Sequence, residues 1–377
     1  MITPKQRLGF GLMRLPLTNP EKEDSIDIEL MEKMADAFLE RGFTYFDTAW
    51  MYCGGKSEEA AGKAIVTRND RSSFTLTSKL PAYMLKEEAD RDKIFDEQLR
   101  RTKAEYFDYY LLHDVNGETI ETFRKLNCFE WALQKKKEGK IKTFGFSFHD
   151  GPELLDEILT EHPEVEFVQL QINYLDWESL GICSRRCYET VIKHNKKVIV
   201  MEPVKGGTLA KVPDKVEKLF RSVHPDWSPA SWAIRFAASL DGVMVVLSGM
   251  SNMEQMLDNT GYMQDFTPLN DEEKAVCLKA AEIINEIVTI PCTGCSYCTV
   301  NCPMNIPIPK YFSLYNSDIN EKKLTGNSWT SQCGYYSIIT KNYSSPMDCL
   351  KCGECEKMCP QHLNIREYLE DVGKHFS

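Results

Sequence analysis

The chain has 377 residues, of which 42% are hydrophobic, and it carries a formal net charge of −11. This length and composition predict one large domain with a smaller one beside it. The acidic balance argues against a nucleic-acid partner, which requires a basic surface, and no apolar run approaches the roughly 18 residues of a membrane span. We therefore expect a cytoplasmic enzyme without membrane association, whose 14 cysteines include metal ligands rather than a disulfide framework.

Short β-rich runs alternate with longer helical patterns from Leu8 to about Gly261. The expected strands are 8–13, 43–50, 73–80, 107–114, 141–148, 167–174, 197–204 and 243–250. The expected helices between them include 26–41, 56–69, 86–105, 120–139, 152–161, 184–195 and 229–240. Strands that alternate with helices form parallel βαβ units, and this number of units favours a (β/α)8 TIM barrel. A doubly wound sheet is less well supported, because no G-x-G-x-x-G fingerprint is present.

A change of composition after the barrel marks a second domain. A further helical stretch, 271–288, leads to Pro291, beyond which cysteine and proline are frequent. We expect the barrel to span 1–268, a connecting helix to lie within 269–290, and a mainly helical C-terminal domain to cover 291–377.

Four polar side chains stand at or just after the carboxyl ends of the second, third and fourth expected strands: Asp47, Tyr52, Lys79 and His113. Barrels of this type hold their active sites at that end. A tyrosine has a pKa of about 10, and a buried ammonium favours its phenolate, so we expect Lys79 to lower the pKa of Tyr52. Asp47 would keep Lys79 charged, and His113 would polarise a carbonyl oxygen as hydride arrives. Each residue alone could be a structural polar group, but the set favours catalysis.

At these residues the sequence resembles the aldo-keto reductases. The resemblance runs over residues 6–262 in family order, through LGFGLMRLP, FDTAWMYCGGKSEEAAGKAI, TLTSKL, LLHD, GFSFHD, VQLQINY and LSGMSNMEQMLDN. It implies that Asp47, Tyr52, Lys79 and His113 form the family's catalytic tetrad, with Tyr52 as the proton donor. It also implies hydride transfer from reduced NADP or NAD to a small-molecule carbonyl substrate.

The same resemblance implies a set of cofactor contacts at the barrel mouth. Ser147 and Gln171 would bind the carboxamide of the nicotinamide, and residues 202–207 would run beside the pyrophosphate. The full set is Gly11, Met13, Ser147, Gln171, Met201, Pro203, Val204, Gly206, Gly249, Asn252, Gln255 and Asn259.

The sequence departs from the family pattern in three places. Phe148 and His149 stand where an Asn is usual, and Met201 stands where an aromatic residue commonly stacks on the nicotinamide. Gly249 and Gln255 occupy the positions of a Lys and an Arg that bind the 2′-phosphate of NADP in many members. We therefore expect weak discrimination between the two dinucleotides. Lys205 or Arg235 could supply a replacement cation.

Three further residues near the expected site have open roles. His149 either contacts substrate or caps the turn that follows it. Asn173 shares the inward face of its strand with Gln171, as a pocket residue or as barrel filling. Cys53 is expected to be a bystander thiol rather than a redox group.

The C-terminal region holds two cysteine runs of the same spacing, C-x2-C-x2-C-x3-C-P. The runs are Cys292, Cys295, Cys298 and Cys302, then Cys349, Cys352, Cys355 and Cys359. Each cysteine of the second run lies 57 positions after its counterpart, which indicates an internal duplication. The region resembles a bacterial-type two-cluster 4Fe-4S ferredoxin domain, in which the fourth cysteine of each run binds the other cluster. Zinc is the alternative, although zinc sites seldom need two complete four-cysteine runs.

Together these features predict an oxidoreductase of aldo-keto reductase type whose two 4Fe-4S clusters relay electrons, with a ferredoxin- or flavodoxin-type protein as redox partner. One alternative is a plain NAD(P)H-dependent carbonyl reductase with structural or oxygen-sensing clusters. The other is an electron-transfer protein whose barrel is not catalytic. Hydride transfer moves two electrons whereas each cluster accepts one, so a flavin could serve as intermediary, but no flavin motif is evident.

Overall fold

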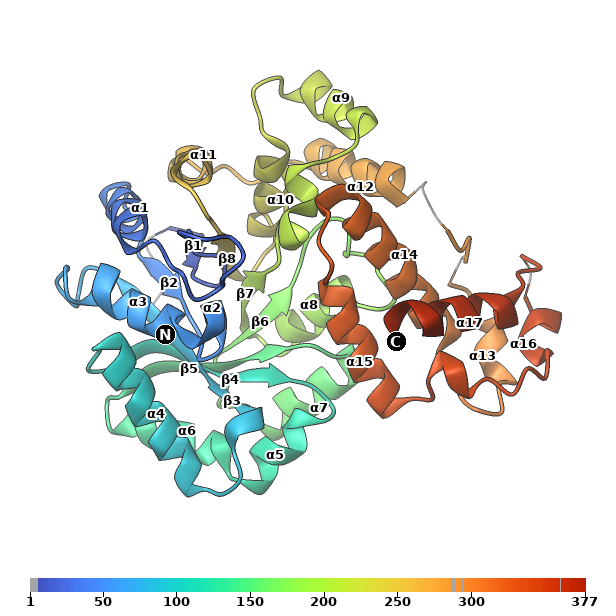
Figure 1. Cartoon of the computed structure of the whole chain (residues 1–377), viewed down its shortest axis with the longest axis horizontal. Coiled ribbons are helices and arrows are strands. Elements are labelled where there is room, and N and C mark those ends of the chain that lie inside the picture. Colours follow the sequence, from blue (N-terminus) through green and yellow to red (C-terminus); the bar gives the residue numbers. More distant parts are fainter. Residues whose placement is uncertain (1–5, 286–288, 293, 360) are drawn as a thin grey trace.

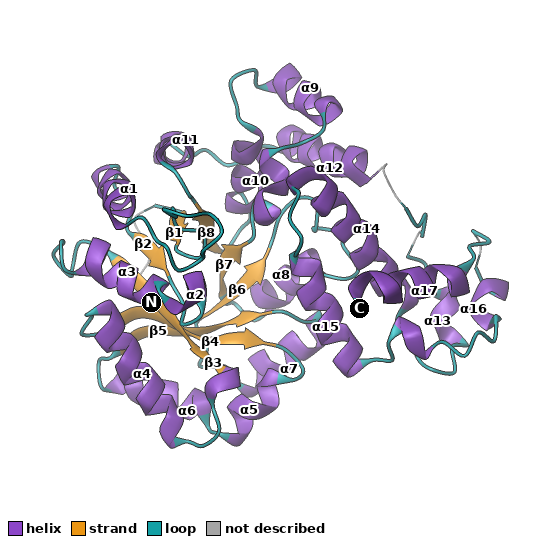
Figure 2. Ribbon diagram, in the orientation of Figure 1, coloured by secondary structure: helices purple, strands orange, loops and turns teal. Residues whose placement is uncertain are grey.

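The N-terminal part of the computed structural model is a closed barrel of parallel strands, ordered β1 to β8 as in the chain (Figures 1 and 2). The model describes residues 6–285, 289–292, 294–359 and 361–377. The strands are β1 Leu8–Gly11, β2 Tyr45–Asp47, β3 Thr75–Pro81, β4 Phe107–Val115, β5 Ile141–Phe148, β6 Phe167–Gln171, β7 Lys197–Met201 and β8 Val243–Gly249. The prediction of a (β/α)8 barrel is confirmed, although most strands end earlier than expected because their last residues turn into the loops of the mouth.

Helices surround the barrel on its outside, and one short helix that begins at Tyr52 lies at its mouth (Figure 2). They are α1 Ile28–Glu40, α2 Tyr52–Gly55, α3 Ser57–Ala61, α4 Ala89–Thr102, α5 Thr119–Lys125, α6 Cys128–Lys137, α7 Pro152–Glu161, α8 Ser184–Lys193, α9 Asp214–Val223, α10 Pro229–Ala238, α11 Met253–Gln264 and α12 Asp271–Asn285. The expected single helix over 120–139 is wrong, because the chain breaks at Asn127, whose φ of 46° is left-handed. The expected helix over 271–288 is present as far as Asn285, and its last three residues lie outside the described part.

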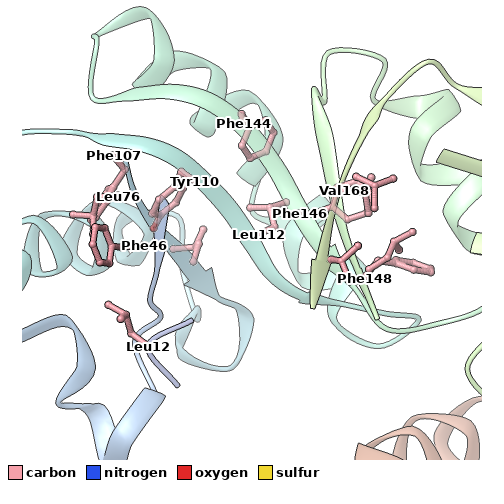
Figure 3. Packing of buried hydrophobic residues seen from close by; sticks show 14 of the residues in the cluster. Leu12, Phe46, Leu76, Phe107, Tyr110, Leu112, Phe144, Phe146, Phe148 and Val168 are labelled. Carbon is pink, nitrogen blue, oxygen red and sulfur yellow. The ribbon is translucent and has the colours of Figure 1, made fainter. Parts of the chain in front are cut away.

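The barrel interior is filled by side chains, which confines any site to one end. Inward-facing residues such as Tyr45, Tyr109 and Phe167 pack on one another, with ring centroids 5.2 and 5.3 Å apart. Their chain neighbours Phe46 and Tyr110 point outward into the larger core between strands and helices (Figure 3). This alternation follows from the two-residue period of a strand. Because the centre is packed, a substrate can reach the barrel only at its mouth.

The C-terminal region is mainly helical and has a core of its own. Its helices are α13 Tyr297–Val300, α14 Ile308–Thr325, α15 Ser331–Asn342, α16 Glu354–Lys357 and α17 Ile365–Phe376. Ile308, Tyr311, Leu314 and Leu369 are among the buried residues of this core. The domain limits 1–268, 269–290 and 291–377 stay a prediction.

Two C-terminal helices contact the loops at the barrel mouth. Figure 1 shows α14 and α15 between the barrel and the group of α13, α16 and α17. Leu314 of α14 packs on Gly181, in the loop after β6. Lys341 of α15 pairs with Glu118, in the loop after β4. The two parts of the chain therefore share the surface at which the barrel opens.

Among the described residues, no helix combines the length and the apolar character that crossing a membrane requires.

A glycine in β5 tests the packing of neighbouring strands. A Cβ at Gly145 would collide with the carbonyl oxygen of Phe167 in β6. We expect Gly145→Ala to lower the free energy of unfolding by about 1–3 kcal/mol. Gly261→Ala in α11 is the matched control, because its Cβ would meet only Arg41 Nη1 at 3.8 Å. Urea unfolding followed by circular dichroism should show a lower midpoint for Gly145→Ala alone. Equal midpoints for the two variants would contradict this packing.

Candidate active site

The structure brings Asp47, Tyr52 and Lys79 together at the mouth of the barrel. Asp47 ends β2, Lys79 lies in β3, and Tyr52 begins α2. The ammonium of Lys79 is fully buried and donates to Asp47 Oδ1 at 2.6 Å, to the Thr48 carbonyl oxygen at 2.9 Å and to the Tyr52 hydroxyl at 3.2 Å. Its three donors are thus all used, which a buried ammonium requires.

Charge at this site is governed by burial and by the Lys79–Asp47 pair. Burial alone would lower the pKa of Lys79, but Asp47 and Tyr52 outweigh it and raise that pKa, so Lys79 stays charged. Burial also raises the pKa of Tyr52, and the opposing effect of Lys79 is smaller. The expected lowering of the Tyr52 pKa is therefore wrong. The hydroxyl keeps its proton at neutral pH and can act as an acid.

His113 stands beside this group on the next strand. Pro81 of β3 pairs with His113 of β4, and the rings of Tyr52 and His113 are 6.0 Å apart in an edge-to-face arrangement. Burial, then the nearby Lys79 charge, lowers the pKa of His113 well below its usual value. The imidazole is neutral at physiological pH, so one ring nitrogen carries a hydrogen that can be donated to an oxygen.

The two residues expected to bind the carboxamide have other partners. Ser147 Oγ accepts from the backbone nitrogen of Asp114 at 2.9 Å. Gln171 Nε2 donates to Asp176 Oδ2 at 2.9 Å, and Asn173 Nδ2 donates to the same oxygen at 2.8 Å. Asn173 thus belongs to a polar network around Asp176. The carboxamide contacts stay a prediction.

Lys205 and Arg235, the two residues considered as replacement cations for the 2′-phosphate, both have other partners. Lys205 is fully buried and donates to Asp176 Oδ1 at 2.6 Å. Arg235 lies on the outer helix α10, where its guanidinium sits 4.1 Å from the centroid of the Trp227 ring. Both interpretations are wrong, because Asp176 binds the Lys205 ammonium and the Arg235 guanidinium packs on the Trp227 ring.

Arg14 is a cation at the mouth that the sequence interpretation missed. Its side chain lies over Gly249, where an added Cβ would be 3.2 to 3.4 Å from the Arg14 side-chain carbons. It lies 4.0 Å from Glu202 Oε1 and 3.6 Å from the position of a Cβ at Gly206. Arg14 therefore stands between the loops after β7 and β8. The absent side chain at Gly249 leaves the room that it occupies.

The remaining expected cofactor contacts line these loops or cap the next helix. Asn252 Oδ1 accepts from the backbone nitrogen of Gln255 at the start of α11, and Asn259 Nδ2 donates to Ser248 Oγ at 3.0 Å. Gly11 pairs with Gly249 at the ends of β1 and β8. The other members of the set are placed as follows: Met13 is exposed, Met201 ends β7, and Pro203, Val204 and Gly206 follow it. Their roles stay a prediction.

The C-terminal domain adds side chains to the mouth. Tyr335 of α15 is buried, and its ring centroid lies 6.1 Å from that of His149. Glu321 of α14 is 3% exposed and lies against Gly206. Gln332 of α15, with its amide oriented to satisfy its neighbours, accepts from Lys205 Nζ at 2.5 Å and donates to Glu321 Oε2 at 2.9 Å. No motif marks these residues, because the contacts arise only when two distant parts of the chain pack together.

Two cavities in the C-terminal domain are each lined by four cysteines. The first is lined by Cys292, Cys295, Cys298 and Cys359. The second is lined by Cys302, Cys349, Cys352 and Cys355. Each cavity thus takes three thiols from one run and the fourth from the other. Three thiols from one run and a fourth from the other is the ligand pattern of two-cluster 4Fe-4S domains. Pro360, which follows the second run, lies outside the described residues.

The barrel and the polar group at its mouth define a class of protein, and comparisons with known proteins identify it. Residues 7–282 match the model of the aldo/keto reductase family. Residues 291–363 match the model of the 4Fe-4S dicluster domain. The chain belongs to the aldo/keto reductase family and is an oxidoreductase that carries a C-terminal iron–sulfur domain.

Individual relatives agree with this assignment. An uncharacterized oxidoreductase of Bacillus subtilis (strain 168), YqkF, is 26% identical over 290 residues, which cover 67% of this chain and 85% of its own. An uncharacterized oxidoreductase of Schizosaccharomyces pombe is 30% identical over 135 residues, 34% of this chain and 44% of its own. An aldo-keto reductase from Bacillus halodurans (holo form) has a TM-score of 0.56 at 24% identity, covering 74% of this chain and 96% of that one. One from Klebsiella pneumoniae, in complex with NADPH, has a TM-score of 0.56 at 20% identity, covering 74% and 95%.

The cysteine cavities generate a prediction about metal content. We expect about eight irons and eight sulfides per chain after anaerobic reconstitution. Cys302→Ser should reduce the iron to about four, with loss of the cluster held mainly by Cys349, Cys352 and Cys355. Elemental analysis and electron paramagnetic resonance of the reduced protein measure both effects. Cys333→Ser is the control, because Cys333 lines neither cavity. Two zinc ions with negligible iron would contradict the assignment.

Proposed function

We propose that this protein reduces the carbonyl group of a small molecule, with NADPH or NADH as the hydride donor and Tyr52 as the proton donor. The observation that carries the proposal is the buried chain of contacts from Asp47 through Lys79 to the Tyr52 hydroxyl. Such an arrangement holds an acidic proton at one defined point of the barrel mouth, beside the neutral ring of His113.

The residues divide the work of the reaction between them. When bound, a reduced nicotinamide supplies a hydride, that is a proton with two electrons, to the carbonyl carbon. Tyr52 gives its proton to the carbonyl oxygen, so that a new C–H and a new O–H bond replace the carbonyl π bond. Lys79 stabilises the phenolate left on Tyr52, and His113 donates a hydrogen bond to the oxygen as negative charge develops there. Asp47 keeps Lys79 charged and oriented.

The loops after β7 and β8 fit the phosphates of the dinucleotide. Phosphate sites in (β/α)8 barrels are frequently built from these two loops and a short extra helix. Here Gly206 and Gly207 have φ values of 63° and 104°, and they lie in a short 3-10 helix, Lys205–Ala210. Glycine at both positions leaves no side chain between this turn and an anion, and the Gly207 backbone nitrogen donates to the Val204 carbonyl oxygen at 3.1 Å, which holds the turn in place. Arg14 adds the cation between the loops.

We further propose that the two cysteine-lined cavities hold 4Fe-4S clusters that relay single electrons to or from a small ferredoxin- or flavodoxin-type protein. Cys295 and Cys352 are exposed, so each cavity reaches the surface where such a protein could approach. Anaerobic addition of NADPH or NADH tests the link to the barrel. Bleaching of the cluster absorbance supports a relay, whereas unchanged absorbance favours clusters with a structural or oxygen-sensing role.

The proton donor is tested by Tyr52→Phe, which keeps the ring and removes the transferable proton. We expect carbonyl reduction to fall by roughly 10² to 10⁴ while nucleotide affinity stays within about twofold. Tyr83→Phe is the matched control, because Tyr83 is 62% exposed. Steady-state kinetics with an aldehyde panel, together with calorimetric titration of NADPH, separates the two effects. Wild-type turnover in Tyr52→Phe would exclude Tyr52 as the acid.

The phosphate loops generate a second prediction. We expect the preference for NADPH over NADH to stay below about 2 kcal/mol, because Gly249 and Gln255 offer no charge to a 2′-phosphate. Arg14→Ala should weaken both dinucleotides by about 5- to 10-fold, since a charge-assisted contact to phosphate is lost. Arg221→Ala, an exposed residue paired within α9, is the control. Calorimetric titration at low and high salt gives the values. A larger preference that shrinks with salt would reveal a phosphate clamp elsewhere.

A further inference from the structure

One carboxylate of the C-terminal domain lies against the loop after β7. Glu321, on α14, is 3% exposed. A Cβ at Gly206 would lie 2.9 Å from Glu321 Oε1, so the carboxylate lies directly against the backbone of this turn. The iron–sulfur domain therefore places a titratable group on the same two-glycine turn to which we assign the pyrophosphate.

Glu321 shares its surroundings with more acids than free cations. Lys205 Nζ is committed to Asp176 Oδ1 at 2.6 Å. In the part of the chain that the structure describes, the Glu321 carboxylate forms no ion pair, and it accepts a hydrogen bond from the amide of Gln332. Burial raises the pKa of Glu321 to about 7; Lys205 opposes the rise, and Glu202 and Asp176 add to it. Both protonation states are therefore accessible near neutral pH.

We propose that Glu321 sets the affinity of the barrel for its dinucleotide, because its carboxylate lies where the pyrophosphate would approach the loop after β7. The inference rests on the proposed function, namely that the barrel binds NADPH or NADH. Ionised Glu321 repels the two negative charges of a pyrophosphate, whereas protonated Glu321 presents a neutral group and can donate a hydrogen bond to it. Glu321 acts through charge and makes no contact with the reacting atoms.

The direction of the pH effect follows from linkage. A bound pyrophosphate raises the pKa of Glu321 further, so the complex takes up a proton as it forms. The affinity is then constant well below pH 7 and falls as the pH rises above it, by at most about tenfold per pH unit. Two charges about 7 Å apart at an effective dielectric of about 20 give a total effect of roughly 10- to 100-fold.

Other charged groups face Glu321, and their effects on the pH dependence must be distinguished from its own. From the barrel these are Glu202, Asp176, Lys205 and Arg14. From the C-terminal domain, Asp318 faces it, and Asp318 itself accepts from Lys322 and from His375. NADH is the suitable probe, because the 2′-phosphate of NADPH titrates near pH 6 and would add its own pH dependence to the Kd.

The test is calorimetric titration of NADH into the anaerobic holoprotein between pH 6 and pH 9, in two buffers of different ionisation enthalpy. We expect the Kd of the wild type to rise by roughly 5- to 20-fold from pH 6.5 to pH 8.5, with a proton uptake that is largest near pH 7.5 to 8, at roughly 0.5 to 0.8 proton per NADH. Glu321→Gln mimics the protonated acid, so its Kd should stay near the low-pH value throughout, without proton uptake. Glu118→Gln is the control, because it removes one negative charge at the same domain contact, beside Lys341.

A nucleotide-free measurement checks that the variant is folded and that Glu321 titrates as proposed. A folded-state pKa of about 7 lies above the ordinary value of 4.5, so ionised Glu321 destabilises the fold. The wild type should lose stability relative to Glu321→Gln as the pH rises from 4.5 through 7. Thermal unfolding across that range should therefore give Tm values that converge at low pH and favour the variant above pH 7.

The outcomes separate this inference from the function on which it rests. A pH-independent Kd for NADH in the wild type, matched by Glu321→Gln, would overturn the role of Glu321 and leave the reductase proposal intact. Failure of both proteins to bind either NADH or NADPH at pH 6, where Glu321 is protonated, would overturn the reductase proposal and the role of Glu321 with it. The inference is supported if the Kd for NADH rises with pH in the wild type and in Glu118→Gln but not in Glu321→Gln.

Discussion

The buried pair of Lys79 and Asp47 is the constraint on which the site depends. A buried ammonium without a counter-charge is costly, so the end of β3 can hold Lys79 only because the end of β2 supplies Asp47 at 2.6 Å. The pair leaves one donor of Lys79 for the Tyr52 hydroxyl. Below it the barrel is filled by aromatic and aliphatic side chains. The chemistry is therefore confined to the mouth, where Tyr52 and His113 are only partly buried.

The same mouth is where the C-terminal domain meets the barrel. Asp176, at the centre of a polar network, accepts from Gln171 and from Lys205. Gln332 and Glu321 extend that network into α15 and α14. A displacement of these helices would change the charge beside the loop after β7, so the iron–sulfur domain and this loop are physically coupled. The coupling uses side chains that the hydride-transfer chemistry itself does not need.

The two cysteine-lined cavities explain why the C-terminal runs are duplicated. Each cavity takes its fourth cysteine from the other run, so neither can be completed by one run alone. The two halves of the domain are thereby tied together, with Ile308 lining both cavities between them. Hydride transfer moves two electrons and a cluster one, so a fusion of these modules has to divide an electron pair if the clusters take part in turnover.

Much of this architecture could be read from the sequence, because local patterns carry it. The eight strands follow from short β-rich runs between helical periods, and the cysteines that line the two cavities follow from their spacing. The grouping of Asp47, Lys79 and His113 is predicted because barrel strands present polar residues at their carboxyl ends. Tertiary structure alone decided the rest. The pKa of Tyr52 rises because burial outweighs the charge of Lys79, and Lys205 is unavailable to a phosphate because Asp176 binds it. Arg14 and Glu321 reach the loop after β7 from positions about 190 and 115 residues away from Gly206. Burial and long-range pairing depend on what the folded chain brings together, and no local pattern records that.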